Sequence, residues 1–176
     1  MSRSSARCVL LFVGLILSSA VPRSSPAQTT PAIDKLQPLA FLAGSCWKGT
    51  FKGRTVTDEH CFTWKFGGRF LRDRHVVRGD SIPYEGETTY AWDGPQNRIV
   101  YWYIAQPGFY SHGQVESADG ALRFRDNLVT SRERELRITW RRSGTDAYNV
   151  LVEEVTGGNA RELWSMMMQR SRTAPE

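Results

Sequence analysis

The stretch from Cys46 to His75 constrains the fold of this chain more than any other part of its sequence. It reads CWKGTFKGRTVTDEHCFTWKFGGRFLRDRH, and apolar residues alternate in it with polar or charged ones. Such a period of two is typical of β-strands that bury one face. Glycines break the pattern at Gly53-Arg54 and again at Gly67-Gly68. The stretch therefore predicts three consecutive antiparallel strands joined by two-residue turns, the first with glycine in the leading position of a type II′ turn.

These turns determine which residues lie opposite one another on neighbouring strands. The first turn places Cys46 opposite Cys61. In the same register Trp47 lies opposite His60, and the second turn places His60 opposite His75. The register was derived from the turns alone, and it nevertheless places the two cysteines opposite each other, which supports the prediction.

The same register separates the two faces of the predicted sheet. Charged residues and both cysteines fall on one face, which we expect to point outward. The predicted inward face carries Trp47, Phe51, Val56, Asp58, His60, Phe62, Trp64, Phe66, Leu71, Asp73, His75 and Val77.

Turn signals recur at short spacing along the rest of the chain, and the segments between them are rich in β-branched and aromatic residues. Strands are predicted over residues 87–93, 98–104, 110–117, 122–127, 133–142, 148–155 and 161–170, and a short helix or helical turn within residues 32–43. About ten strands in one meander predict an all-β fold, a single up-and-down antiparallel β-barrel, because closing the sheet removes its exposed edges. A β-sandwich is the competing arrangement.

The N-terminus has the composition of a secretory signal peptide. Arg3 and Arg7 precede the apolar run CVLLFVGLIL, which is too short to span a membrane, and cleavage is expected after Ala20 or Ala27. We expect residues 1–27 to be a signal peptide, residues 28–35 a disordered leader, residues 36–171 one barrel domain and residues 172–176 a polar tail. Export leads to the periplasm or the medium. An uncleaved N-terminal anchor is the alternative.

Charge and cysteine count bound the partners and the compartment. The chain has 23 basic and 18 acidic side chains, and residues 1–27 hold three of the basic and none of the acidic ones, which leaves a net charge of +2. That excess is too weak to indicate nucleic acid as a partner. No apolar run in the remaining chain is long enough to span a membrane. Cys46 and Cys61 remain after cleavage, and a pair in an oxidising compartment predicts a disulfide, with two free thiols as the alternative.

Polar groups stand out on the predicted inward face. His60 and His75 lie opposite each other, and Asp58 and Asp73 share their face, each two positions along a strand from a histidine. Burying such groups costs free energy unless they are paired. Three explanations stay open: a hydrogen-bonded network with no ligand, polar anchors for an organic ligand, or a metal or haem site with His60 and His75 as ligands.

The organic-ligand interpretation divides the site between an apolar wall and polar anchors. The wall is predicted to be Trp47, Phe62, Trp64 and Leu71, and the anchors His60, Asp73 and His75. His112 is expected to face outward, and the run Met166–Met168, in alternation, mostly to fill core. The chain has no GxSxG elbow, P-loop or dinucleotide fingerprint, so no hydrolytic or transfer activity is predicted.

The segments LAFLAGSCWKG, WKFGGRFL, YEGETTYAWD and IVYWYI resemble successive segments of a family of bacterial lipocalin-like proteins. The resemblance covers residues 36–170 and implies a calycin-type barrel, without an assigned activity. The opening is also similar to that of nitrobindins, ten-stranded barrels in which a late histidine holds a ferric haem. The last predicted strand here, RELWSMMMQR, has no histidine, so His60 or His75 would have to substitute.

The sequence therefore predicts an exported barrel that holds a small, apolar or amphipathic molecule in its cavity. A haem- or metal-binding barrel enzyme is the second hypothesis. The third is a non-catalytic envelope protein that acts through its outer surface, for which we expect a barrel packed solid by aromatic side chains.

Overall fold

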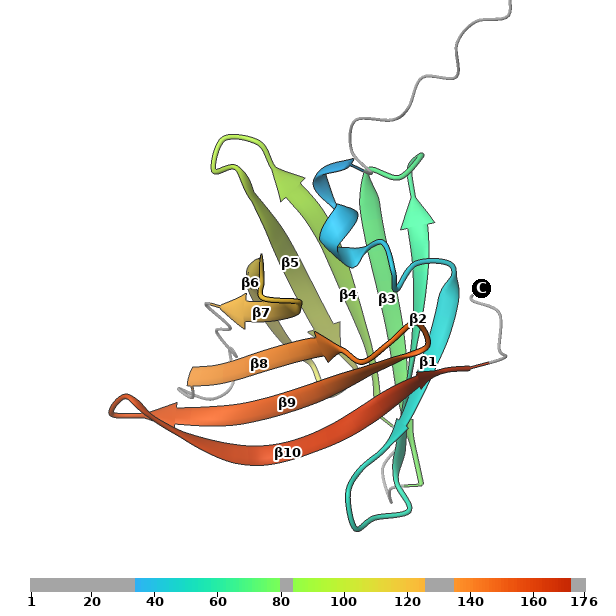
Figure 1. Cartoon of the computed structure of the whole chain (residues 1–176), viewed down its shortest axis with the longest axis vertical. Coiled ribbons are helices and arrows are strands. Elements are labelled where there is room, and N and C mark those ends of the chain that lie inside the picture. The colour runs from blue at the N-terminus through green and yellow to red at the C-terminus, as the bar shows by residue number, and fades with distance from the viewer. Residues whose placement is uncertain (1–33, 80–83, 126–134, 172–176) are drawn as a thin grey trace, which may run out of the picture.

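Antiparallel strands follow one another around a closed barrel in strict sequence order, and the first strand pairs with the last (Figure 1). The structure is a computed structural model that describes residues 34–79, 84–125 and 135–171. Ten strands lie within these ranges. The predicted all-β, up-and-down barrel is confirmed, and the alternative β-sandwich is wrong, because closure leaves no separate second sheet.

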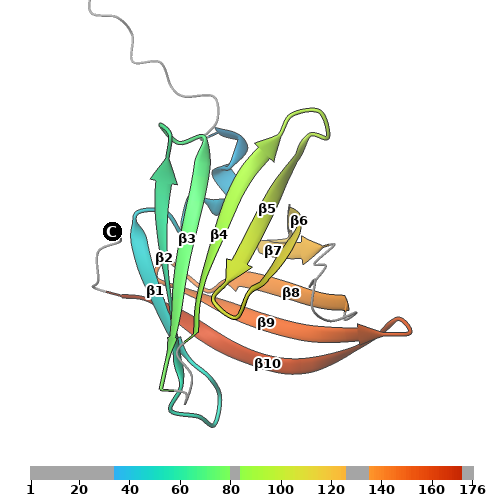
Figure 2. The ribbon, with the colours of Figure 1, turned by 180° about the vertical axis from the view of Figure 1, so that it is seen from behind.

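The strands match the predicted segments closely, and a single 3-10 helix, η1 (Gln37–Leu39), precedes them. Figure 2 shows the reverse side of the barrel, where β2 to β5 run side by side. The strands are β1 (Ser45–Thr50), β2 (Thr57–Lys65), β3 (Phe70–Arg78), β4 (Tyr84–Asp93), β5 (Arg98–Ala105), β6 (Phe109–Ala118), β7 (Ala121–Arg125), β8 (Glu135–Arg142), β9 (Ala147–Thr156) and β10 (Asn159–Arg170).

The register of the first three strands is the predicted one. Cys46 pairs with Cys61, and Trp47 pairs with His60. His60 also pairs with His75 across β2 and β3. Because side chains alternate along a strand, this register places both histidines on the inner face of the barrel.

The first corner forms a different turn from the predicted one. Strand pairing ends at Thr50 and Thr57. The Arg54 amide donates to the Phe51 carbonyl oxygen at 3.0 Å, so the turn runs from Phe51 to Arg54. Gly53, with a φ of 73°, occupies its second central position, not the leading one. A left-handed φ at that position favours glycine, and the register is unchanged because the longer loop has the same centre.

The second corner is also longer than predicted. Lys65 pairs with Phe70, and the Gly68 amide donates to the Lys65 carbonyl oxygen at 3.1 Å. Phe66 therefore lies in the loop, with a φ of 52°, and is 80% exposed. The prediction that Phe66 points inward is wrong, because alternation ends where the strand ends.

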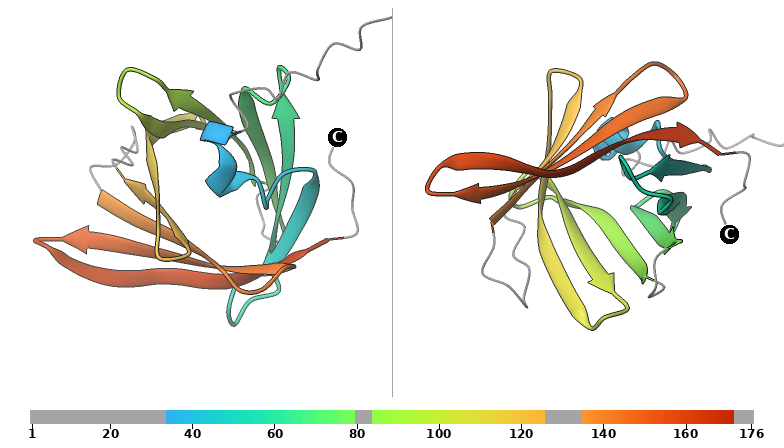
Figure 3. Two further views of the ribbon diagram at one scale, coloured as in Figure 1. Left: turned by 45° about the horizontal axis from the view of Figure 1, so that its top comes forward. Right: turned by 90° about the horizontal axis from the view of Figure 1, so that it is seen from below.

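The segment that precedes β1, residues 34–44, closes one end of the barrel (Figure 3). Leu36, Leu39 and Leu42 are fully buried, as expected for a short helical segment that packs over the strands. The Trp47 indole nitrogen donates a hydrogen bond to the Leu42 carbonyl oxygen at 3.1 Å, which ties this segment to β1. Leucine side chains therefore cover the aromatic core at this end of the barrel.

The predicted disulfide between Cys46 and Cys61 is present and joins β1 to β2. None of the described helical segments has the length and apolar character to cross a membrane. The predicted signal peptide, residues 1–27, most of the expected leader, residues 28–33, and the tail, residues 172–176, lie outside the described residues, as do the expected strand ends at 126–127 and 133–134.

Candidate functional site

The barrel contains a cavity of about 810 Å³. Pockets for small organic molecules usually have volumes of roughly 300–1,000 Å³, so this cavity is of the right size for one. Its lining residues come from strands around the whole barrel, from β2 to β10. The structure therefore offers an internal binding space, not a solid aromatic core.

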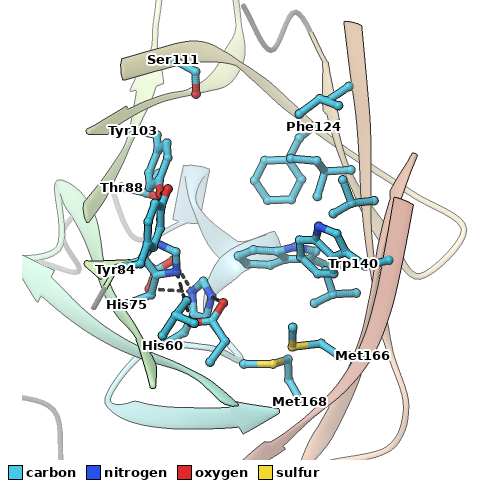
Figure 4. A pocket seen from close by; sticks show the side chains of 18 of the residues that line it. His60, His75, Tyr84, Thr88, Tyr103, Ser111, Phe124, Trp140, Met166 and Met168 are labelled. Atoms are coloured by element: carbon cyan, nitrogen blue, oxygen red, sulfur yellow. Dashed lines mark hydrogen bonds and ion pairs between the residues drawn. The ribbon is translucent and has the colours of Figure 1, made fainter. Parts of the chain in front are cut away.

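The cavity has two chemically different sides. On the side formed by β2 to β6, polar and titratable side chains predominate: Asp58, His60, Asp73, His75, Tyr84, Thr88, Tyr90, Tyr101, Tyr103 and Ser111. We call this set the polar wall. On the side formed by β7 to β10 every lining residue is apolar or aromatic: Phe124, Leu136, Ile138, Trp140, Val150, Val152, Leu163, Trp164, Met166 and Met168. We call this set the apolar wall. Figure 4 shows the two walls facing each other.

His60 is the centre of the polar wall. Its Nδ1 donates to Asp73 Oδ2 at 2.9 Å, and its Nε2 donates to Asp58 Oδ2 at 3.2 Å. Asp58 lies two positions before His60 on β2 and therefore on the same face. The two carboxylates thus hold one imidazole ring from both sides.

The network continues from Asp58 to His75 on β3, then to Tyr103 on β5 and Tyr84 on β4. The second oxygen of Asp58, Oδ1, lies 3.2 Å from His75 Nδ1. His75 Nε2 is hydrogen-bonded to the Tyr103 hydroxyl at 3.0 Å, and this hydroxyl is hydrogen-bonded to that of Tyr84. A row of acid–base groups, linked by hydrogen bonds and by one ion-pair contact between Asp58 and His75, therefore runs along the polar wall, and dashed lines in Figure 4 mark interactions of this kind.

Burial and charge set the protonation of the row. Burial alone would lower the pKa of His60, but the negative charges of Asp73 and Asp58 and their hydrogen bonds raise it well above its usual value. Burial alone would raise the pKa of Asp58, but attraction to His60 and the hydrogen bond from it hold that pKa far below its usual range. At neutral pH, therefore, His60 is an imidazolium and Asp58 a carboxylate.

Tyr84, Tyr90 and Tyr103 of the polar wall remain neutral phenols. Burial is the main reason that the pKa values of Tyr84 and Tyr103 lie above the ordinary value for a phenol. The pKa of Tyr90 is also raised well above that value, again chiefly by burial. Neutral phenols both donate and accept hydrogen bonds, so they suit the polar group of a bound molecule.

Two buried polar atoms stand apart from the hydrogen bonds of the row. Asp58 Oδ1 and His75 Nδ1 face each other at 3.2 Å, an ion-pair distance. Neither atom has an aligned hydrogen-bond partner among the described residues. Buried polar atoms usually have such partners, so this pair needs an explanation.

Gly86 and Gly49 belong to the site although no motif in the sequence points to them. A Cβ on Gly86 would overlap His75 Nε2 and the ring of Tyr103. A Cβ on Gly49 would crowd the sulfur atoms of Met166 and Met168. The absence of a side chain at each glycine leaves room for the neighbouring side chains that line the cavity. The only signal for this in the sequence was a glycine within a predicted strand.

The predicted site residues occupy two levels of the barrel. His60, Asp73 and His75 line the cavity together with Asp58. Trp47, Phe62 and Leu71 are fully buried in the hydrophobic core, and Trp64 packs against it partly buried. None of these four predicted wall residues lines the cavity, because alternation determines the face of a residue but not its depth along the barrel.

The other sequence expectations for side chains on the inner and outer faces agree with the structure. His112 is exposed, as expected. Met166 and Met168 are buried in the core and also line the cavity, whereas Met167 between them is 49% exposed.

The arrangement of the histidines does not fit a haem. An axial ligand needs a ring nitrogen that points into an open apolar slot, as in haem proteins held by one histidine. Both ring nitrogens of His60 are directed at carboxylates, and those of His75 are directed at Asp58 and Tyr103. The last strand, β10, contains no histidine. Neither imidazole therefore presents a nitrogen to the open cavity as an axial ligand would.

Together these features define a closed, antiparallel, ten-stranded barrel with an internal cavity, compatible with a calycin-type fold. No protein-family model matches the chain, and no curated protein is detectably similar to it in sequence. The fold and the cavity therefore carry the functional argument.

Proposed function

We propose that this protein binds a small amphipathic organic molecule inside the barrel. The observation that carries the proposal is the division of the cavity into an apolar wall and a polar wall. A ligand that lies between them buries its hydrocarbon part against β7 to β10, which stabilises the complex by about 25 cal/mol per Å² of apolar surface removed from water. Its polar group faces the histidine, aspartate and tyrosine side chains of β2 to β5.

We also propose that the protein is an exported, lipocalin-like carrier. The apolar N-terminal segment of the sequence and the disulfide between Cys46 and Cys61 both support export. The internal cavity favours a carrier over the alternative of an envelope protein that acts only through its outer surface, for which we expected a solid interior.

Fluorescence titration with N-phenyl-1-naphthylamine tests the binding proposal. This probe combines aromatic rings with one N–H group and fluoresces when it leaves water. Val152 lines the cavity, and Val152→Phe fills part of that space. We expect the substitution to weaken binding about tenfold, which corresponds to about 1.4 kcal/mol.

The neighbouring residue on β9 provides the matched control. Leu151 is not among the lining residues, and alternation points it outward, so Leu151→Phe adds a phenylalanine at the same depth but outside the cavity. Its affinity for the probe should equal that of the wild type. If neither variant changes the titration, or if the wild type does not bind the probe, the cavity is not the binding site. Native mass spectrometry of the protein isolated from its own source then identifies the natural ligand.

A further inference from the structure

Three metal-ligating side chains meet on the polar wall for reasons of register. His60 on β2 and His75 on β3 are direct cross-strand partners, and their ring centres are 4.6 Å apart. Asp58 precedes His60 by two residues, so its carboxylate joins them on the same face. The backbone pairing of two strands therefore brings two imidazoles and one carboxylate to one point.

The separations of the three groups match those of a coordination site. One ligand atom from each residue lies within 4.8 Å of the other two. His60 Nε2 and His75 Nδ1 each lie 3.2 Å from an oxygen of Asp58. With bonds of about 2.0–2.1 Å to a tetrahedral metal ion, neighbouring ligand atoms are about 3.3 Å apart. The three ligand atoms, which lie within 4.8 Å of one another, must therefore draw closer together to admit an ion.

The contact between Asp58 Oδ1 and His75 Nδ1 is an independent sign that this point of the polar wall suits a cation. Asp58 is only 4% exposed, and its Oδ1 has no hydrogen-bond partner among the described residues. His75 Nδ1, which faces it, has none there either. The two atoms face each other at 3.2 Å without the alignment of a hydrogen bond, and a cation bound between them would coordinate both at once.

Outer-shell hydrogen bonds already orient both imidazoles for coordination. His60 Nδ1 donates to Asp73, which leaves Nε2 for an ion, and His75 Nε2 contacts the Tyr103 hydroxyl, which leaves Nδ1. Histidines that bind metals in proteins usually have their second nitrogen held in this way by a carboxylate or another polar group. The polar wall thus supplies ligands and their supports together.

We propose that Asp58, His60 and His75 bind a divalent first-row transition-metal ion such as Zn²⁺. Two imidazoles and one carboxylate are a donor set that zinc and non-haem iron sites share. The ion replaces the proton that His60 Nε2 shares with Asp58. Asp58, His60 and His75 all line the cavity, so water or the polar group of a bound molecule could complete the shell of the ion. The site does not depend on the proposed organic ligand.

Titration of the untagged, chelator-treated protein with Zn²⁺ alone tests this inference. Calorimetry should show one ion per chain, and Co²⁺ in its place should give the intense visible absorption of a four- or five-coordinate site. Asp58→Asn keeps the shape of the side chain but removes the charge, and His75→Gln removes one imidazole. We expect each to weaken Zn²⁺ binding by about 100-fold or more, because removing a ligand costs at least as much as removing an outer-shell partner.

His112→Gln is the matched control, because His112 is the third histidine of the chain and is exposed on β6. It should bind Zn²⁺ like the wild type. A wild-type measurement guards against variants that do not fold: on adding Zn²⁺, the imidazole NMR signals of His60 and His75 should shift while those of His112 stay in place. Absence of binding, unchanged affinity in both folded site variants, or a shift confined to His112 would overturn the proposal.

Discussion

At the scale of single residues, Gly86 controls the shape of the polar wall. A methyl group at this position would overlap His75 Nε2 and the ring of Tyr103, both of which take part in the hydrogen-bonded row. We expect Gly86→Ala to separate the two side chains and to lower the free energy of unfolding by about 1–3 kcal/mol, the usual cost of overpacking a well-filled site. Urea unfolding of the variant and the wild type measures this difference.

Gly94 offers the control for that substitution. A Cβ built there has no atom within 4 Å, and its φ does not lie in the left-handed region. Gly94→Ala should therefore leave the free energy of unfolding nearly unchanged. Equal stabilities of the two alanine variants would mean that His75 and Tyr103 adjust freely, and that Gly86 is not needed for their contact.

At the scale of elements, the β1–β2 hairpin depends on its disulfide. Cys46 and Cys61 are 15 residues apart in sequence, and a cross-link that closes a loop of that size stabilises a fold by about 3 kcal/mol through the unfolded state. We expect the Cys46→Ala/Cys61→Ala double variant to lose about that much in urea unfolding. Reductant should destabilise the wild type and have no effect on the double variant; a reductant effect of equal size in both proteins would contradict this account.

The same hairpin shows why the sequence predicted the inner face correctly with the wrong turns. A two-residue loop and a longer loop with the same centre leave every residue opposite the same partner, so the pairing of Cys46 with Cys61 and of His60 with His75 is insensitive to the error. Only corner residues such as Phe66 change their environment. The face on which a strand residue lies thus depends only on whether it is an odd or an even number of positions from a known residue, and the local sequence gives that number.

At the scale of the whole molecule, the depth of a residue along the barrel could not be predicted. Trp47 and Trp140 both face inward and are both buried, yet only Trp140 lines the cavity. Depth depends on the tilt and stagger of the strands around the closed barrel, which arise from the pairing of all of them and not from any one segment. The histidines and aspartates of the polar wall lie on β2 and β3, whose register follows from one turn, and they were foreseen. The apolar wall faces them only because the closed barrel brings β7 to β10 round to the opposite side.

Closure of the barrel depends on the short pairing between β1 and β10, which we call the seam, and Arg170 pairs there with Trp47. Its guanidinium carbon lies 4.3 Å from the centre of the Trp47 ring, and its Nε donates to Asp146 Oδ1 at 2.8 Å. Arg170→Gln removes the cation–π contact and the ion pair, so we expect a loss of about 1 kcal/mol in unfolding free energy.

Hydrogen exchange of β1 and β10 amides in this variant should accelerate more than that of β4 and β5, because the weakened seam opens first. Arg161→Gln, which removes an exposed ion pair with Glu154 at the far end of β10, should not have this effect. Uniform acceleration in all strands would show instead that the barrel opens only by global unfolding.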